Sequence, residues 1–457
     1  MSRKLFGTDG IRGVANIKLT PELAMKLGAA AGRWLAKEGL PLKVVVGRDS
    51  RKSGTMLGAA LAAGLNSAGV DVTTLAISPT GAISWVGRTQ GFSMAIVISA
   101  SHNPAPDNGI KLIASNGAKV SDETEAWIES QLEESFDRPT GGAVGQIFAD
   151  RSALEGYMSW LESLVPERLE GMTIAVDAAN GAAYELGPEI FRRLGATVYS
   201  TGTTPDGMNI NEEGGATKPE IVQKLTMESK ADLGIAFDGD ADRAVFSDDQ
   251  GRLVNGDRTM AIWSSHWRER LDPKVVVGTV MSNMGFEKYL TSQGIELVRA
   301  AVGDKYVSQE LSKLGGKVGG EQSGHIIFPD LGPTGDGLVT ALELARVLKR
   351  EGRTLASFYE DFDNWSQLLV NVEVGTKDGW ETNEPLQAAI QSASAALEGR
   401  GRINVRPSGT QPMIRVMVEA DDETLRDQES EKVVSAMLAA LGGKIYSRVD
   451  LTHALGD

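Results

Sequence analysis

The sequence predicts an α/β protein with three topologically similar α/β domains, whose sheets are mixed and largely parallel. A smaller C-terminal α+β domain completes the fold around a central cleft. Three observations predict this architecture. The chain has 457 residues, more than one hydrophobic core usually serves. A pattern of strand, loop, helix, glycine and strand recurs three times, and the pattern changes from residue 368 onward.

Each repeat begins with a short β-branched run that ends in a loop containing Gly or Asn, and a helix-like segment follows. A helix-ending glycine and a second strand-like run come next. The first runs lie at residues 43–50, 172–181 and 274–283, and the second runs lie at 67–75, 193–201 and 292–300. Such alternation predicts right-handed βαβ units on a largely parallel sheet.

A third strand-like run in each repeat leads into a polar loop that contains glycine or proline. The loops are SASHNP (99–104) after MAIVI, DGDADR (238–243) after DLGIAF, and EQSGH (321–325) after KVGG. Ligands gather outside the carboxyl ends of parallel strands. Three equivalent polar loops therefore predict one shared cleft.

The C-terminal part contains strand-like and helix-like segments in another order. They read LLVNVEV, EPLQAAIQSASAALEG, RINV, MIRVMVEA, DETLRDQESEKVVSAMLAAL and KIYS. This order predicts a smaller α+β domain. We place the four domains at residues 1–150, 151–250, 251–366 and 367–457.

Composition excludes several classes of function. The net charge of −15 and the pI of 4.9 argue against nucleic-acid or membrane-surface binding, which needs a basic face. The chain has no cysteine, so it has no thiol nucleophile, and its four scattered histidines argue against a multi-histidine metal site. No secretory signal or membrane-length apolar run is evident, so we expect a soluble cytoplasmic protein.

The loop DGDADR places Asp238, Asp240 and Asp242 at alternate positions. Alternate side chains of an extended loop share a face, so three carboxylates converge there and favour a divalent cation. All-oxygen ligands indicate Mg²⁺, whose remaining positions suit water or phosphate oxygens. A calcium-binding EF-hand loop and a metal-free acidic loop are the alternatives.

The segment RPSGTQPMIR offers a phosphate site. Arg406 and Arg415 can each fork onto phosphate oxygens, while Ser408, Gly409 and Thr410 supply hydroxyl and backbone N–H donors. Pro-Ser-Gly-Thr is also ordinary turn chemistry, which stays an alternative.

The loop GEQSGH brackets polar side chains with glycines that let a ligand approach the backbone. Glu321 and Ser323 are candidates for binding sugar hydroxyls, and a polar hairpin turn is the alternative reading of this loop.

Ser101 follows a core strand, next to His102. A serine does not easily pair with its immediate neighbour as a nucleophile and base, and SASHNP is no nucleophile elbow, so a serine hydrolase is disfavoured. A phosphorylated Ser101 facing the three aspartates would instead carry a phosphoryl group. Arg243 or Lys111 would then take up developing charge.

Together and in this order, SASHNP, DGDADR, GEQSGH and RPSGTQP resemble the four signature loops of the α-D-phosphohexomutase family. The resemblance covers essentially the whole chain. It implies four domains around one cleft, with Ser101 as phosphoserine and one Mg²⁺ held by Asp238, Asp240, Asp242 and a phosphoserine oxygen. It implies that Glu321 and Ser323 bind and recognise the sugar hydroxyls. It also implies that the non-reacting phosphate is held by Arg406, Ser408, Gly409, Thr410 and Arg415.

The resemblance also places Arg12, His102, Lys111 and His325 at the reacting centre, with Lys111 and then His325 favoured for proton transfer. FGTDGIRG (6–13) and GEQSGH are most similar to the branch that acts on aminosugar phosphates. Two residues depart from that branch. Gln411 stands where glutamate is usual, and Lys305 stands where arginine is commoner, which keeps the charge but loses the planar fork.

The implied reaction interconverts glucosamine 6-phosphate and glucosamine 1-phosphate through a bisphosphorylated sugar, and it supplies aminosugar for UDP-N-acetylglucosamine and the cell wall. Phosphorylation of Ser101 would be required. The alternative within the family is a phosphomannomutase/phosphoglucomutase. A phosphosugar-binding protein and a metal-dependent phosphatase are the alternatives outside it. The expected partner is a small phosphosugar, without nucleic acid or membrane, and a homodimer stays an option.

Overall fold

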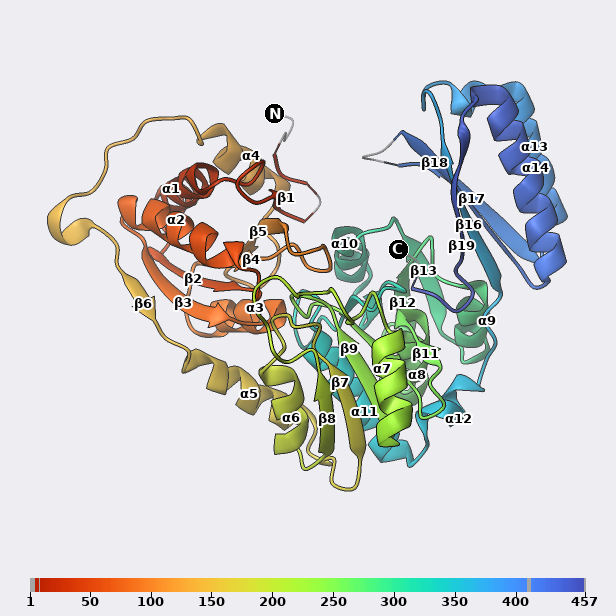
Figure 1. Ribbon diagram of the computed structural model, residues 1–457, viewed down its shortest axis with the longest axis horizontal. Helices are drawn as coiled ribbons and strands as arrows, with labels where there is room; N and C mark the ends of the chain where they lie inside the picture. The colour runs from red at the N-terminus through yellow and green to blue at the C-terminus, as the bar shows by residue number, and fades with distance from the viewer. Residues whose placement is uncertain (1–4, 8, 409–411, 456–457) are drawn as a thin grey trace.

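The structure is a computed structural model that describes residues 5–7, 9–408 and 412–455. Its strands form four sheets, each with helices packed against it (Figure 1). The sheet orders are β1-β5-β4-β2-β3-β6, β11-β10-β9-β7-β8, β13-β12-β14-β15 and β17-β18-β16-β19. Every strand pairing in the fourth sheet is antiparallel, whereas the other three sheets are mixed. The predicted fold class is therefore confirmed.

The elements follow one another in the order of the four domains. The first domain contains β1 (Ile11–Val14), α1 (Pro21–Lys37), β2 (Lys43–Arg48), α2 (Ser53–Ser67), β3 (Asp71–Ile77), α3 (Thr80–Thr89), β4 (Met94–Ile98), β5 (Asp107–Ala114), α4 (Asp122–Ser130) and β6 (Ile147–Ala149), and α5 (Ala153–Leu164) follows. The second contains β7 (Thr173–Asp177), α6 (Leu186–Arg193), β8 (Thr197–Thr201), α7 (Glu220–Ser229), β9 (Leu233–Phe237), β10 (Ala244–Ser247) and β11 (Leu253–Val254).

The third domain contains α8 (Gly256–Trp267), β12 (Val275–Thr279), α9 (Met284–Ser292), β13 (Glu296–Ala300), α10 (Asp304–Leu314), β14 (Gly319–Gly320), β15 (Ile326–Ile327), α11 (Gly337–Glu351) and α12 (Leu355–Tyr359). The fourth contains β16 (Ser366–Glu373), α13 (Glu384–Ala396), β17 (Gly401–Pro407), β18 (Met413–Ala420), α14 (Glu423–Leu441) and β19 (Lys444–Asp450).

The sequence repeat appears as one shared strand order. In the first three sheets the first repeat strand lies between the second and third, and an antiparallel strand flanks the third. The three series are β3-β2-β4-β5, β8-β7-β9-β10 and β13-β12-β14-β15. The loops after β4, β9 and β14 therefore leave equivalent edges of their sheets, as the repeat predicts. The edge strands β1 and β6 lie outside the repeat and extend only the first sheet.

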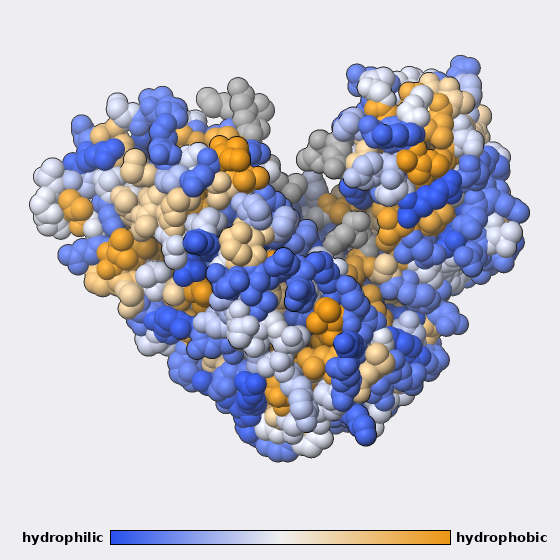
Figure 2. Space-filling model, in the orientation of Figure 1, coloured by the Kyte–Doolittle hydropathy of each residue, from blue (hydrophilic) through white to orange (hydrophobic). Residues whose placement is uncertain are grey.

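Apolar packing joins the first three domains more closely than the fourth. One continuous cluster of buried apolar residues runs from Val45 and Tyr157 through Phe237 to Leu348, across all three α/β domains. The fourth domain has its own cluster around Val370. Figure 2 shows the surface deeply notched between the first and fourth domains. No helix in the described part of the chain is both long and apolar enough to cross a membrane.

Two glycines let α1 and α2 pack unusually closely on the first sheet. A Cβ atom on Gly28 would lie 2.2 Å from the Leu61 carbonyl oxygen, and one on Gly64 would lie 2.0 Å from the Met25 carbonyl oxygen. Both distances are far below contact, so any side chain at either position would push the helices apart. The closely packed helices α1 and α2 therefore cover the face of the first sheet opposite α3.

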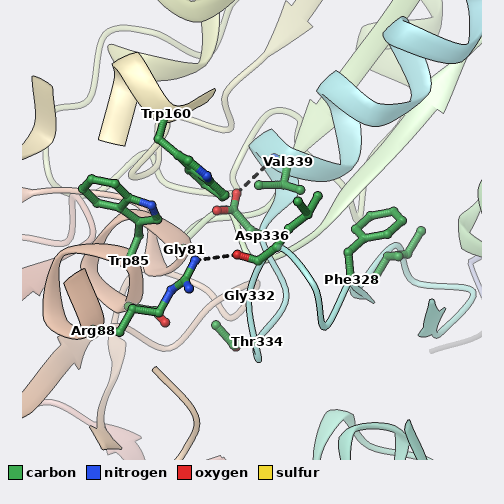
Figure 3. A pocket seen from close by; sticks show the side chains of 12 residues that line it. Gly81, Trp85, Arg88, Trp160, Phe328, Gly332, Thr334, Asp336 and Val339 are labelled. Carbon is green, nitrogen blue, oxygen red and sulfur yellow. Dashed lines mark hydrogen bonds between the residues drawn. The ribbon is translucent and has the colours of Figure 1, made fainter. Parts of the chain in front are cut away.

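A small pocket between the first and third domains contains a buried carboxylate (Figure 3). Asp336 lies there among Trp85 and Trp160, and Arg88 reaches across to the chain of the third domain. Tyr157 Oη donates a hydrogen bond of 2.7 Å to Asp336 Oδ2. The cavity volume of about 20 Å³ has room for one water molecule, so this pocket is too small for a sugar phosphate.

Burial raises the pKa of Asp336 to about 6 from its usual 3.8. Because the folded-state pKa is raised, the contribution of Asp336 to stability is full below pH 3.8 and is lost as the pH rises through 6. Asp336→Asn should therefore stabilise the protein relative to the native chain at pH 8 but not at pH 4, by up to about 3 kcal/mol. Thermal unfolding of both chains at the two pH values measures this difference.

Asp422→Asn is the matched control, since Asp422 also caps a helix, α14, but is exposed. Asn is an equally good cap, so the control should behave alike at both pH values. An equal shift in Tm at pH 4 and pH 8 for Asp336→Asn would show that this carboxyl titrates normally.

Candidate active site

Many of the predicted site residues line one cavity of about 280 Å³, close to the usual range for small-molecule sites, whereas His102, Lys111, Asp238 and Asp240 are not among its lining. Each domain contributes to its lining. The predicted residues among those that line it are Arg12, Ser101, Asp242, Arg243, Glu321, Ser323, His325, Arg406 and Arg415. Four loops far apart in the sequence thus share one cleft.

Ser101 is buried in the turn that follows β4, and its backbone is left-handed with φ 52°. Its Oγ donates a hydrogen bond to Asp238, which joins the serine of the first domain to the acidic loop of the second. His102 Nδ1 lies 3.4 Å from the same Oγ, at the outer limit of a hydrogen bond. The expectation that these neighbours do not pair is therefore met only in part, since the two side chains do approach each other.

Asp238, Asp240 and Asp242 are buried, and one ligand oxygen from each lies within 4.8 Å of the others. Burial raises the pKa of Asp238 well above its usual value, and the neighbouring carboxylates of Asp242 and Asp240 raise it further. The three charges therefore repel one another in a site from which water is largely removed.

The carboxylate oxygens of these three aspartates are suitable ligands for a hard cation. Lys111 and Thr80 both approach Asp240 Oδ2, and Lys111 also approaches Asp242 Oδ2. The other oxygens, Asp240 Oδ1 and Asp242 Oδ1, are buried without a hydrogen-bond partner among the described residues. Unpaired buried carboxylate oxygens beside a third carboxylate match the all-oxygen coordination of Mg²⁺.

Lys111 lies within this group of carboxylates. Its Nζ is 2.9 Å from Asp9, 3.1 Å from Asp240 and 3.4 Å from Asp242. Burial alone would lower the pKa of Lys111, but Asp240 and Asp9 raise it well above its usual value. Lys111 is therefore protonated in the structure, which makes it a proton donor.

Asp9 and Thr80 are site residues that the sequence prediction did not include. Asp9 lines the cavity and pairs with both Lys111 and Arg12. Thr80 begins α3 and donates 2.7 Å from Oγ1 to Asp240 Oδ2. Its position after β3, at the same carboxyl edge as the polar loops, was the available signal for Thr80.

His325 faces Asp242 across 3.7 Å and is buried. Burial alone would lower its pKa, but the Asp242 carboxylate raises the pKa to about 9. At neutral pH the imidazole is consequently protonated and adds a second positive charge close to the acidic loop.

The opposite end of the cavity is cationic. Arg406 and Arg415 are directly opposed on the neighbouring strands β17 and β18, and both line the cavity. Burial lowers the pKa of Arg406, and the like charge of Arg415 lowers it further. An anion between the two guanidinium groups would relieve this repulsion, as a phosphate does in bidentate contacts.

Other predicted residues of this region lie around the cationic end. Glu321 Oε1 accepts a hydrogen bond of 2.9 Å from Gly303 N, which fixes the carboxylate in the lining. Ser408 is buried, its carbonyl accepts from Lys377 Nζ at 2.6 Å, and it is not among the described residues that line the cavity. Gly409, Thr410 and Gln411 lie outside the described residues.

Lys305 has a structural partner. Its Nζ donates 2.6 Å to Asp122 Oδ2, so the ion pair links α10 of the third domain with α4 of the first. Lysine in place of arginine therefore keeps a single point contact between the two domains.

Comparison with known protein families finds four domains along the chain, in the same order as in the structure. Four family models match in order, each described as phosphoglucomutase/phosphomannomutase. They are alpha/beta/alpha domain I at residues 3–138, domain II at 155–251, domain III at 255–365 and the C-terminal domain at 369–436.

Curated relatives match almost end to end. The chain is 45% identical over 443 residues to a phosphoglucosamine mutase of Shouchella clausii, covering 96% of this chain and 99% of the relative. It is 44% identical over 444 residues to a phosphoglucosamine mutase of Bacillus subtilis, again covering 96% and 99%.

Among solved structures, a phosphoglucomutase/phosphomannomutase family protein from Burkholderia thailandensis superposes with a TM-score of 0.82 at 24% identity, over 96% of this chain and 98% of that one. The match of all four family models, together with the curated relatives, shows that this chain belongs to the phosphoglucomutase/phosphomannomutase family of α-D-phosphohexomutases.

Proposed function

We propose that this protein is an isomerase that interconverts glucosamine 6-phosphate and glucosamine 1-phosphate and so supplies aminosugar for UDP-N-acetylglucosamine. The observation that carries the proposal is the contact of Ser101 Oγ with Asp238 in a cavity whose far end holds Arg406 and Arg415. Relatives at 44–47% identity that bear the name phosphoglucosamine mutase support the substrate.

The site would work with Ser101 phosphorylated. Asp238, Asp240, Asp242 and a phosphoserine oxygen would hold one Mg²⁺, which would supply charge neutralisation at the transferring phosphoryl group. Arg243 and Arg12, which line the same cavity, would add positive charge as it develops.

In the first half-reaction the bond between phosphorus and the Ser101 oxygen breaks, and a bond forms between phosphorus and the free sugar hydroxyl. The hydroxyl loses its proton and the serine oxygen gains one. We assign these proton movements to Lys111 and then His325, which lie against the acidic loop, while His102 lies beside the serine oxygen. Lys111 and His325 are both protonated, so the group that gives its proton to the leaving serine oxygen would then take up the proton of the sugar hydroxyl.

The sugar then carries two phosphates and must present the other one to Ser101. The second half-reaction is the reverse transfer, so the serine regains its phosphoryl group and no phosphate is lost. Arg406, Ser408, Gly409, Thr410 and Arg415 would hold whichever phosphate is not reacting, and Glu321 and Ser323 would read the sugar hydroxyls in both orientations. The small fourth domain has its own main apolar core and only a small apolar cluster shared with the third domain, which suits this exchange.

Assay on a panel of hexose phosphates tests the substrate. We expect kcat/KM for glucosamine phosphate to exceed that for glucose or mannose phosphate by about 10-fold or more, because a site that pairs a polar substituent rejects analogues without it. Glucose 1,6-bisphosphate, added at one fixed concentration throughout, keeps the loading of Ser101 equal between substrates.

Other outcomes point to the alternatives. Comparable efficiency on mannose or glucose phosphate would identify a phosphomannomutase/phosphoglucomutase. Steady release of inorganic phosphate would identify a phosphatase, and binding without turnover would identify a phosphosugar-binding protein. Each of these three outcomes contradicts the aminosugar mutase.

A further inference from the structure

We propose that Asp49, Arg51 and Asn211 act as positioning residues that hold Ser101 toward the metal-binding carboxylates. The inference rests on the proposed phosphoserine function. It assigns a role to the loop after β2, which the repeat places at the same edge as the site, and to Asn211 of the second domain.

Two side chains from two domains bind the same pair of carbonyl oxygens. Arg51 donates from Nη2 to the Ser101 oxygen at 3.1 Å and also to the Asn103 oxygen. Asn211 donates from Nδ2 to these two oxygens at 2.9 Å and 3.1 Å. The turn that carries Ser101 therefore cannot rotate without losing hydrogen bonds to both domains.

The turn needs such support because of its backbone. Ser101 has φ 52°, a left-handed conformation that is unfavourable for residues with a side chain and persists only where the surroundings enforce it. Its N–H donates 2.8 Å to Ser99 Oγ, and Ser99 in turn donates to Asp49. Hydrogen bonds thus hold the residue on both its N–H and its carbonyl.

Asp49 connects the two halves of this support. It accepts the hydrogen bond of Ser99 and forms an ion pair with Arg51, and the Arg51 N–H also donates 2.9 Å to Asp49 Oδ1. Both charged side chains are fully buried. A buried charge is tolerated only with a partner, so each of the two fixes the position of the other.

The supported turn lies directly against the acidic loop. A Cβ atom on Gly239 would lie 2.4 Å from the Ser101 carbonyl oxygen and 2.8 Å from Asn211 Nδ2. The neighbouring Asp238 accepts the hydrogen bond of Ser101 Oγ. A shift of the Ser101 carbonyl would therefore move the nucleophile relative to the carboxylates. Phosphoryl transfer depends on such alignment, whereas binding of the distant phosphate does not.

Asn211→Asp tests the proposal, because it keeps the shape but replaces the N–H donors with an oxygen that repels both carbonyls. We expect kcat to fall by about 10- to 100-fold, with KM within about 3-fold of the native value. The Tm should fall, because the buried carboxylate faces two carbonyl oxygens, so kcat is compared at a temperature at which circular dichroism shows both chains fully folded. Transfer of phosphate from glucose 1,6-bisphosphate to Ser101, followed by intact mass, should slow by the same factor. Asn16→Asp is the matched control, since Asn16 is exposed and also left-handed, with φ 64°.

Arg51→Lys provides a second variant, as lysine keeps the charge next to Asp49 but lacks the second terminal nitrogen, which binds the two carbonyls. It should lower kcat in the same direction. Native kcat in Asn211→Asp would overturn the proposal, as would a fall in kcat that only follows a loss of folded protein. A native protein that is inactive on every hexose phosphate would instead refute the proposed function, so the two failures are distinguishable.

Discussion

Ser101→Ala should lower mutase activity on glucosamine 6-phosphate by about three orders of magnitude or more, the largest effect we expect of any single substitution. The side chain is buried, and its hydroxyl donates to Asp238 of the acidic loop from the neighbouring domain. Alanine removes the oxygen that would carry the phosphoryl group and leaves the rest of the turn in place. Initial rates with saturating Mg²⁺ and sugar bisphosphate measure the loss.

Ser130→Ala is the control for this variant, because Ser130 is an exposed serine at the end of α4 in the same domain. The native protein and the control should carry one phosphate by intact mass, which phosphatase treatment removes. The Ser101 variant should carry none. Native activity in Ser101→Ala, at an unchanged Tm, would exclude the phosphoserine mechanism.

Asp240→Asn should lower kcat by about 100-fold and raise the Mg²⁺ concentration needed for half-maximal activity. One of the Asp240 oxygens accepts from Thr80 and Lys111, whereas the other is buried without a partner among the described residues. The amide offers a weaker ligand and no charge, so the site should lose affinity for the cation. A chelator should abolish the activity of the native enzyme, and added Mg²⁺ should restore that activity.

A direct measurement of Mg²⁺ binding shows whether the lower kcat of Asp240→Asn comes from weaker metal binding or from a displaced Lys111. Calorimetric titration with Mg²⁺ should find one site per native chain and a weaker one in Asp240→Asn. Asp249→Asn, an exposed aspartate at the far end of β10, should match the native protein. An Asp240→Asn variant that turns over normally with trace metal would show that the cation binds elsewhere.

Sequence alone could predict the local part of the site. The convergence of Asp238, Asp240 and Asp242 was predicted from their alternate spacing. The loop is however a turn with Ala241 left-handed at φ 56°, and not the extended segment that the prediction assumed. Ser101 was identifiable because a polar turn follows an entirely apolar strand, β4. The repeat then predicted that the loops share one edge, since parallel strands end together.

Contacts between distant segments could not be predicted in this way. Asn211 binds the Ser101 carbonyl from 110 residues away, and Thr80 binds Asp240 from 160 residues away. No periodicity connects such partners, because they meet only when two domains pack together. β6 was missed for another reason, because Ile147–Ala149 is only three residues long and shows no alternation of apolar and polar residues. The domain boundaries, the homodimer and the cytoplasmic location stay predictions.

Single-turnover transfer from the phosphorylated enzyme tests the central claim most directly. Enzyme carrying labelled phosphate on Ser101 is mixed with less glucosamine 6-phosphate than enzyme, and the reaction is quenched over milliseconds to seconds. The account predicts that label leaves the Ser101 peptide at least as fast as kcat and enters first the sugar bisphosphate and then the hexose monophosphate, with none in inorganic phosphate. Label that stays on Ser101 while product forms, or that passes to inorganic phosphate at the turnover rate, would contradict it.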